Sequence, residues 1–458
     1  MRIISKKMLR AMPVLLVVLL LGLASDNSGQ QKTDKRNRAG SSRTSRRARV
    51  DRTVRSSGST LATDRLIVKF KSGTTAEAAE ALLQYHSLSN IHRIPGVDVY
   101  RGKVPAGVTV RQMVSILKQN AEVSSAGPDY RTKIFDVPND TYFTYYQYNL
   151  RNQGGTIDLG DGLVLTLKSG ADIKASAAWD VTHGSASTII GIVDTGVDMS
   201  HSELSGKVLP TGYDFVNDDA DPTDDNSHGT WVAGIAAAAT NNNSGIAGTA
   251  WNCRILPVKV MGADGTGYYS DMIEGIVYAA DNGVKVINIS AGGTDDDPNL
   301  ETACQYAFNK GVVVVAAAGN FEEGESTAVT YPAAYDNYVL AVAATDYTDS
   351  WADFSCYGPQ VDVAAPGVWI LGPAPQWYVG SDYLPYVFGS GTSGASPQVA
   401  GFAALLFTSK NWLSVSQVMN IIRASADDVN KTQYSGKDNY LGYGRINMGR
   451  GIAAYKIR

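Results

Sequence analysis

The sequence contains few residues of the kinds that cross-link or stiffen a chain. Its 458 residues include only three cysteines and 16 prolines. Three cysteines exclude a disulfide-built scaffold, and a proline content below the usual level of about 5% excludes a proline-rich chain. After residue 24 the sequence also lacks an apolar run long enough to span a bilayer. With 44% hydrophobic and 18% charged residues, the chain has an ordinary globular composition.

Charge divides the chain into parts of different character. Residues 31–60 hold ten Lys and Arg against two Asp, whereas residues 136–458 hold 16 Lys and Arg against 35 Asp and Glu. Phosphate repels so acidic a body, which excludes nucleic acid as its partner. Residues 25–60 have almost no large apolar side chains, so we expect a disordered basic linker there. A nucleic-acid or heparin patch at Arg46 and Arg47 is the alternative.

Residues 1–24 have the layout of a secretory signal peptide. A basic start precedes an apolar run over residues 11–24, and Gly22-Leu23-Ala24 offers small residues for cleavage. The run is shorter than the 18 or so residues of a membrane-spanning helix, so we expect cleavage rather than an uncleaved anchor. The prediction is a secreted protein, extracellular or periplasmic, without membrane contact after signal removal.

Two folded units are predicted after the linker. In residues 61–135 strand and helix patterns alternate as in a ferredoxin-like α+β unit. In residues 136–458 near-continuous apolar runs alternate with amphipathic helices, which predicts an α/β fold with a mostly parallel sheet and helices on both faces. The runs are 188–194, 253–261, 284–290, 312–319 and 339–346, and helices 392–410 and 414–429 close the domain. Functional residues of such sheets lie at the carboxyl ends of the strands.

Four polar residues stand at predicted element boundaries. Asp194 ends the 188–194 run and Asn320 follows the 312–319 run, whereas His228 and Ser393 each begin a helix. Nucleophilic hydrolysis needs these types: a hydroxyl, an imidazole to take its proton, a carboxylate to orient the imidazole, and donors for the oxyanion. Alone, Asp194 would be a solvated strand-end acid and His228 a helix cap. Together the four residues indicate a hydrolase.

The segments around these residues resemble the subtilisin family of serine peptidases, and most nearly its thermitase-like branch. The likeness covers residues 136–458 in the family's order, and residues 61–135 resemble its inhibitory propeptide. The matching segments are Asp194-Thr195-Gly196-Val197-Asp198, His228-Gly229-Thr230, Ala317-Ala318-Gly319-Asn320, Gly391-Thr392-Ser393-Gly394-Ala395-Ser396-Pro397, and the stretches 258–270, 286–290 and 444–447.

The resemblance implies a serine endopeptidase made as a zymogen that processes itself. Asp194 would orient the imidazole, His228 would act as general base and acid, Ser393 as nucleophile and Asn320 as oxyanion donor. The implied substrate-binding residues are Gly265, Thr266, Gly267, Ser290, Ala291 and Gly292 along two edges of a groove, and Ala317, Ala318, Gly319 and Thr330 at the main specificity pocket. The expected partners are protein and peptide substrates and the chain's own propeptide as an intramolecular inhibitor. We expect a monomer.

The precursor's own sequence predicts its specificity. Aligning residues 137–143 with the mature start of thermitase-like chains puts the cut after Phe135. The resemblance implies that the end of the propeptide lies in the active-site groove, where the residue before the cut fills the pocket. We therefore expect a preference for large apolar or aromatic residues. Two alternatives stay open: a dibasic-specific processing protease that uses Glu322, Glu323 and Glu325, and a catalytically inactive peptide-binding relative.

Calcium is the expected cofactor, with a structural role, and no catalytic cofactor is expected. The positions that match one calcium site of thermitase-like relatives are Asp140, Glu203, Ala239, Asn242, Ser244 and Ile246. A second candidate set is Asp214, Asp219, Asp221 and Thr223. Oxygen ligands of these kinds suit a hard cation. A solvated acidic loop is the alternative for each set.

The chain departs from the family pattern close to the implied nucleophile. Gly394 stands where most relatives carry Met, Gln398 replaces a usual His, and Trp231 replaces a His or Cys. None of these changes removes a proton-transfer group. The three cysteines, Cys253, Cys304 and Cys356, are expected to be buried free thiols, with a single disulfide as the alternative.

Overall fold

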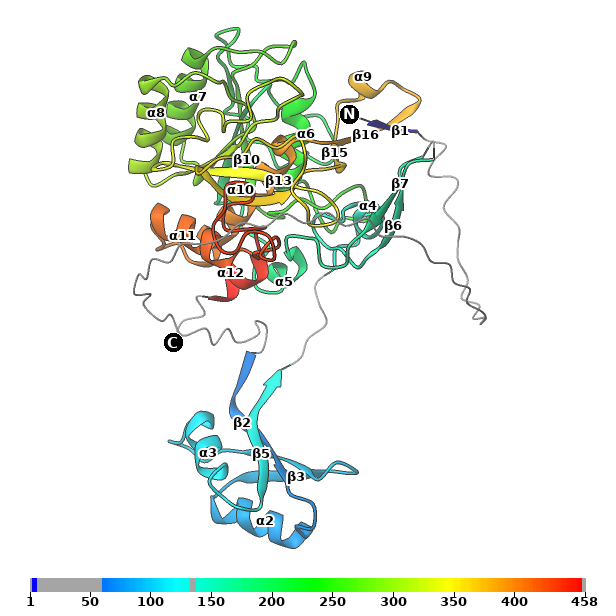
Figure 1. The fold of residues 1–458 in the computed structure, drawn as a ribbon, viewed down its shortest axis with the longest axis vertical. Helices are drawn as coiled ribbons and strands as arrows, with labels where there is room; N and C mark the ends of the chain where they lie inside the picture. The colour runs from blue at the N-terminus through cyan, green and yellow to red at the C-terminus, as the bar shows by residue number, and fades with distance from the viewer. Residues whose placement is uncertain (1, 6–59, 132–136, 161, 455–458) are drawn as a thin grey trace, which may run out of the picture.

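The computed structural model describes residues 2–5, 60–131, 137–160 and 162–454. The predicted signal core, the basic linker and Phe135 lie outside these residues. Figure 1 shows a small domain of residues 60–131 apart from a large domain that follows it. Within the described residues, no helix combines the length and apolarity needed to cross a membrane.

The small domain has the predicted ferredoxin-like fold. Its elements are β2 (Thr60–Phe70), α2 (Ala76–Tyr85), β3 (Ser89–Ile94), β4 (Val99–Lys103), α3 (Val110–Leu117) and β5 (Val123–Arg131). The four strands form an antiparallel sheet in the order β3-β4-β2-β5. Thr75 and Thr109 cap the two helices with their side chains, and Thr109 forms a capping box with Gln112. The domain also has a hydrophobic core of its own, built around Leu66, Leu83 and Leu117.

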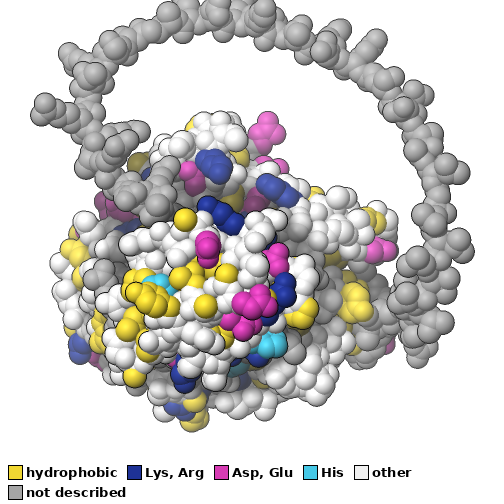
Figure 2. Space-filling view, turned by 90° about the horizontal axis from the view of Figure 1, so that it is seen from below, with side chains coloured by type: hydrophobic (Ala, Val, Ile, Leu, Met, Phe, Trp, Pro, Cys, Tyr) yellow, Lys and Arg dark blue, Asp and Glu magenta, His cyan; other side chains and the backbone are white. Residues whose placement is uncertain are grey.

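The surface of the small domain carries mixed charge. Figure 2 views the molecule from below and shows Lys and Arg interspersed with Asp and Glu on that face. Exposed ion pairs join Arg65 to Asp129 and Lys103 to Asp64. Each such pair contributes at most about 1 kcal/mol, so the core holds this domain together.

The large domain is built on a seven-stranded sheet in the order β14-β13-β12-β11-β8-β10-β9. Every neighbouring pair in this sheet is parallel, which confirms the predicted fold class. The strands are β8 (Ile189–Asp194), β9 (Tyr213–Asp214), β10 (Arg254–Lys259), β11 (Val286–Ile289), β12 (Val313–Ala317), β13 (Val339–Thr345) and β14 (Val361–Pro366). The chain places β10 on one side of β8 and β11 on the other. The carboxyl end of β8 is therefore a topological switch point, where sheets of this kind form their binding crevice.

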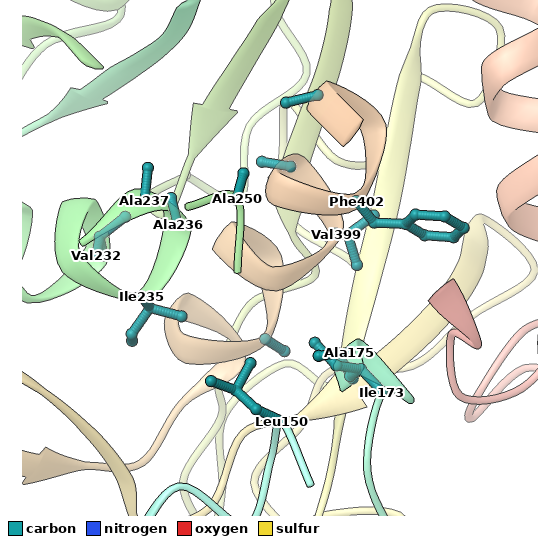
Figure 3. Close-up of a cluster of buried hydrophobic side chains, with 14 of the residues drawn as sticks. Leu150, Ile173, Ala175, Val232, Ile235, Ala236, Ala237, Ala250, Val399 and Phe402 are labelled. Carbon is teal, nitrogen blue, oxygen red and sulfur yellow. The ribbon is translucent and has the colours of Figure 1, made fainter. Parts of the chain in front are cut away.

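Helices cover both faces of the large sheet. Successive residues of a strand point to opposite faces, and in these strands the side chains on both faces are apolar, so each face must be buried. In β12, Val313 and Val315 belong to one core cluster, whereas Val314 and Ala316 belong to the other. The first cluster contains α6 (His228–Ala237), α10 (Thr392–Ser409), α11 (Val415–Ser425) and α12 (Met448–Ala454), and the second contains α7 (Tyr269–Asp281) and α8 (Pro298–Asn309). Figure 3 shows side chains of α6 on one side of α10, and Val399 and Phe402 of α10 on its other side, which faces the segment of Ile173 and Ala175.

Several short elements escaped the sequence prediction. They are β1 (Arg2–Ser5), α4 (Phe143–Tyr146), β6 (Gly155–Asp158), β7 (Val164–Leu167), α5 (Ala175–Trp179), β15 (Ile370–Pro373), α9 (Gln376–Val379) and β16 (Tyr383–Gly389). β6 and β7 form an antiparallel hairpin, and β15, β16 and β1 form a second small antiparallel sheet. In addition, α11 ends at Ser425, four residues before the predicted limit, because residue 426 adopts an extended conformation.

Candidate active site

Asp194 and His228 meet at the carboxyl end of β8. Asp194 is fully buried at the last position of the strand, and His228 is the first residue of α6. The Nδ1 of His228 lies 2.7 Å from Oδ1 of Asp194, which also accepts the Thr195 N–H at 2.8 Å. Burial opposes protonation of His228, but the Asp194 charge and hydrogen bond outweigh it, with a further contribution from Asp224, so the pKa of His228 is raised. The pair can therefore take up and hold a proton.

A second buried carboxylate, Asp224, organises the start of α6 and was missed by the sequence analysis. It is 1% exposed and accepts five hydrogen bonds. Its Oδ1 accepts from Thr195 Oγ1 and from the N–H groups of Asn226 and Ser227, and its Oδ2 accepts from the N–H and Oγ1 of Thr230. The Thr195 hydroxyl in turn accepts the Gly229 N–H at 2.9 Å. The loop after β8 and the first turn of α6 are thus fixed to one another.

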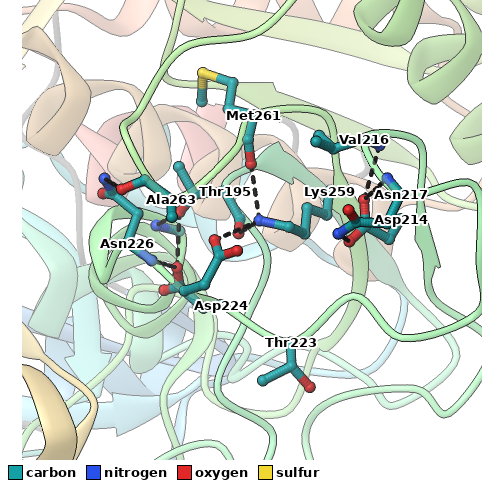
Figure 4. A network of polar contacts seen from close by, with 12 residues as sticks. Thr195, Asp214, Val216, Asn217, Thr223, Asp224, Asn226, Lys259, Met261 and Ala263 are labelled. Carbon is teal, nitrogen blue, oxygen red and sulfur yellow. Dashed lines mark hydrogen bonds and ion pairs between the residues drawn. The ribbon is translucent and has the colours of Figure 1, made fainter.

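Lys259 supports the same region from the neighbouring strand β10. Its side chain is 1% exposed, and its Nζ donates to the carbonyls of Thr195 and Met261, each at 2.9 Å. Its ion-pair partner is Asp225, at 2.6 Å. Figure 4 shows Lys259 pointing toward Thr195 and Met261, beside the Asp224 network. This contact was not predicted from the sequence, because Lys259 stands within an apolar strand.

Ser393 occupies the first turn of α10. Its hydroxyl donates to the carbonyl of Ser290 at 3.0 Å in this structure. Pro397 lies four residues further along the helix and has no N–H for the Ser393 carbonyl, so the Ser290 hydroxyl donates to that carbonyl at 3.1 Å instead. Behind them, Ser396 donates to Asn288, and Asn288 donates to the Ser290 hydroxyl. The turn that carries Ser393 is therefore tied to the end of β11.

Asn320 lies beside Ser393, and hydrogen bonds from Thr392 fix the orientation of the Asn320 side-chain amide. Its Oδ1 accepts both the N–H of Thr392 at 2.9 Å and the hydroxyl of Thr392 at 3.0 Å. The amide oxygen is therefore fixed, and Nδ2 is the group available as a donor. A side chain at Gly391 would come within 3.3 Å of that Nδ2, so glycine keeps the approach open. Nδ2 and the Ser393 N–H at the start of α10 can together act on a developing negative charge.

A cavity of about 420 Å³ adjoins His228. Six predicted groove residues line it: Gly265, Thr266, Gly267, Ser290, Ala291 and Gly292. Its apolar part comes from residues that the sequence analysis did not select, among them Met261, Tyr268, Tyr269 and Met272. These side chains belong to the loop before α7 and to α7 itself. The fold, rather than a sequence motif, brings them to the groove.

The predicted pocket wall and floor also meet. The Thr330 N–H donates to the Ala318 carbonyl at 2.9 Å, and a Cβ placed on Gly319 would lie 2.7 Å from Cγ2 of Thr330. Gly319 has φ of +106°, which a side chain would strain. The acidic residues near this pocket are exposed, and Glu325 accepts the N–H of Glu322 at 2.9 Å.

The first predicted calcium set comes together around two buried carboxylates. Asp140 and Glu203 are 4% and 1% exposed, and neither has an ion-pair partner among the described residues. Burial raises the pKa of both, that of Glu203 to about 7. Asp140 accepts the N–H groups of Asn241 and Asn242, Glu203 accepts the Ile246 N–H, and Asn242 Nδ2 donates to the Ala239 carbonyl. Ser244 lies in the same loop, where its N–H donates to Asn242 Oδ1. Two carboxylates, an amide and nearby carbonyls fit a hard cation.

The second predicted set is arranged differently. Asp214 accepts from Val216 and Asn217, Asp219 accepts from Asp221, and Asp221 accepts both the N–H and the hydroxyl of Thr223. The carboxylates are thus turned to donors of their own loop. Across the described part of the chain, His, Cys, Asp and Glu side chains form no group of three that could hold a metal.

The remaining histidines and cysteines of the large domain have structural surroundings. Nε2 of His201 lies 2.9 Å from the Pro385 carbonyl, and its Nδ1 accepts the Glu203 N–H. The ring of His183 stacks on Trp251. Cys253, Cys304 and Cys356 are all buried and free, as expected, so the single disulfide left open by the sequence does not form in this structure.

Known proteins resemble both domains. The model of the Subtilase family matches residues 185–444, and that of the Fervidolysin N-terminal prodomain matches residues 48–129. The Thermophilic serine proteinase of Bacillus sp. strain AK1 is 43% identical over 83% of this chain and 85% of its own length. Thermitase of Thermoactinomyces vulgaris is 44% identical over 69% of this chain and 99% of its own. Among solved structures, a protease of Pseudoalteromonas arctica PAMC 21717 has a TM-score of 0.58 and 28% identity, and the match covers 70% of this chain and 99% of that one.

Proposed function

Because this chain belongs to the subtilase family and is a subtilisin-like serine endopeptidase with an N-terminal prodomain, we propose that Asp194, His228 and Ser393 are its catalytic triad. The observation that carries the proposal is the 2.7 Å contact between His228 Nδ1 and the buried Asp194 carboxylate. That contact favours the tautomer in which Nε2 holds the lone pair and can accept a proton.

In the reaction that we propose, each of these residues has a separate role. The Ser393 hydroxyl leaves the Ser290 carbonyl by rotation about χ1, gives its proton to His228 and attacks the peptide carbonyl carbon. Asn320 Nδ2 and the Ser393 N–H donate to the oxygen that becomes negative. His228 then protonates the leaving amine, and a water molecule, activated by His228, releases the acyl group from Ser393.

We further propose that the enzyme is exported as a zymogen that cuts itself near residues 135 and 136. The prodomain match and the self-contained small domain support an intramolecular inhibitor that folds as a unit. The substrate runs along Gly265–Gly267 and Ser290–Gly292, adding a strand to those edges. Small side chains at Ala317, Ala318 and Gly319 suit a large apolar or aromatic residue before the cut, with Thr330 limiting the depth of the pocket.

Calcium has a structural role in this proposal. Asp140, Glu203 and Asn242, with the carbonyls of Ala239, Ser244 and Ile246, would hold one ion, which supplies positive charge to two buried carboxylates. The ion would join the start of the large domain to the loop after α6. The set of Asp214, Asp219, Asp221 and Thr223 is a second candidate, which requires its carboxylates to turn away from their own loop.

The central experiment is covalent labelling of the processed protein with a fluorophosphonate, followed by mass spectrometry of the labelled peptide. We expect the label on Ser393, and we expect Ser393→Ala to remain unlabelled, inactive and uncut at residues 135–136. Failure of the native protein to label would favour the inactive peptide-binding relative. A peptide-library profile dominated by Arg or Lys before the cut would favour the dibasic-specific protease and its acidic residues at 322–325.

A further inference from the structure

Trp231 lies between the two helices that carry the proton-transfer groups. It follows His228 by three residues on α6, and the centroids of the two rings are 6.0 Å apart, with the planes tilted by 49°. The Trp231 side chain is 1% exposed, and its indole N–H donates to the Ile370 carbonyl at 3.2 Å. A large, rigid side chain with a fixed orientation thus adjoins the general base of the proposed triad.

Three glycines from three other elements surround the indole. A Cβ added to Gly394 of α10 would lie 2.7 Å from Cη2 of Trp231, and one added to Gly389 of β16 would lie 2.6 Å from Cζ2. A Cβ on Gly372 of β15 would overlap Cδ1. Real Cβ atoms do not approach ring carbons this closely, so each of these positions tolerates only glycine while Trp231 keeps its place.

Gly394 directly follows Ser393, so the indole contacts both halves of the site at once. The absence of a side chain at Gly394 leaves room for the indole directly beside the helix turn that carries Ser393.

We propose that Trp231 is a positioning residue that fixes the spacing between His228 and Ser393 by packing against Gly394. This inference rests on the proposed triad. Since proton transfer requires His228 and the Ser393 hydroxyl to come within hydrogen-bond reach, a displacement of either helix end by about 1 Å lowers turnover by up to about 100-fold. Neither the indole nor Gly394 exchanges a proton, and neither belongs to the substrate groove. Loss of their contact therefore lowers kcat and leaves KM nearly unchanged.

The test is a double-mutant cycle on the processed enzyme with the variants Trp231→Phe, Gly394→Ala and their combination. Phenylalanine lacks the benzo ring that holds Cζ2 and Cη2, and an alanine methyl at 394 would refill part of that space. Trp179→Phe is the matched control, because Trp179 is equally buried and donates its indole N–H to the Thr249 carbonyl at 3.0 Å, outside the site. Variants that do not cut themselves are processed with immobilised wild-type enzyme, and folding is followed by thermal unfolding.

We expect Trp231→Phe and Gly394→Ala each to lower kcat by about tenfold or more, with KM within about twofold of the wild-type value. The kcat of the double variant should be at least threefold higher than that of the less active single variant. Trp179→Phe should lower the melting temperature but leave kcat within about twofold. A double variant no more active than the weaker single variant, or an equal loss of kcat in Trp179→Phe, overturns the inference. If Gly394→Ala fails to fold, the kcat of Trp231→Phe against that of Trp179→Phe decides. Fluorophosphonate labelling of the native protein tests the triad separately, so failure of the triad is distinguished from failure of this inference.

Discussion

Asp224→Asn tests whether a buried carboxylate outside the proposed triad controls both the stability and the pH dependence of the enzyme. If the new amide oxygen takes the place of Oδ1, it keeps three of the five donors, and the NH₂ group then faces the N–H and the hydroxyl of Thr230. Hydrogen bonds to a charged group contribute about 1.5–3 kcal/mol each. The Thr230 hydroxyl can turn to accept, so we expect the free energy of unfolding to fall by about 3 kcal/mol.

The same substitution should change the pH profile. Asp224 contributes to the raised pKa of His228, so removal of its charge lowers that pKa. Catalysis requires neutral His228, and the acid limb of kcat/KM should therefore move to lower pH. Asp194 still faces the His228 ring in this variant and continues to raise its pKa. The acid limb should therefore lie at a higher pH than it would if both carboxylates were removed.

Two measurements check this prediction. Urea unfolding of the processed protein gives the change in stability, and kcat/KM measured against pH gives the limb. Asp225→Asn is the control: its side chain is 47% exposed, it pairs with Lys259, and it does not contribute to the shift of the His228 pKa. Equal displacement of the limb in both variants, or a loss of less than about 1 kcal/mol in Asp224→Asn, would refute the reasoning.

Three further predictions concern the oxyanion, the pocket and the cation. Asn320→Ala should lower kcat by about 10²–10³-fold with little change in KM, which is the loss that removal of one such donor causes in subtilisin itself; steady-state kinetics that put the loss mainly in KM would contradict the role. Thr330→Gly removes three heavy atoms from the pocket, and a difference of one methylene in an apolar pocket is already worth about 1–3 kcal/mol. The substitution should therefore raise kcat/KM for Trp relative to Leu before the cut by about tenfold. An unchanged ratio in a peptide library would show that Thr330 does not limit the pocket. Calcium at 100 times its dissociation constant should stabilise the processed protein by about 2.7 kcal/mol. Calorimetry with calcium or with a chelator should show a smaller stabilisation in Glu203→Gln. An equal calcium response in Glu203→Gln would argue against this site.

The sequence predicted the sheet because its strands are buried on both faces. Runs such as 312–319 are apolar without interruption, and a short run of this kind is typical of a parallel strand that is covered by helices on both faces. The hairpin of β6 and β7 was missed because each strand has only four residues and three of the four in β6 are exposed. β15 and β16 were missed because glycine, proline and aromatic residues obscure their alternation.

Candidate site residues could be proposed from the sequence where a short motif contains them, but not where segments distant in sequence come together in the fold. Asp194 and His228 stand in recognisable segments, whereas Asp224 lies in a run of acidic residues that reads as a solvated loop. Its burial depends on Thr195, 29 residues earlier, and on the helix that follows. The same ambiguity affects Asp214 and Asp221, because composition does not tell whether a carboxylate faces a cation or its own backbone N–H groups.

The three buried thiols bear on how this protein can be handled. No bond between described cysteines holds the large domain together, so its folding requires neither an oxidant nor a disulfide isomerase. Burial also raises the pKa of all three, to about 12 for Cys304 and about 11 for Cys356, which keeps them as unreactive thiols at neutral pH. The large domain should therefore fold equally well in a reducing bacterial cytoplasm and in aerated buffer, and it should keep three titratable thiols after denaturation in either case.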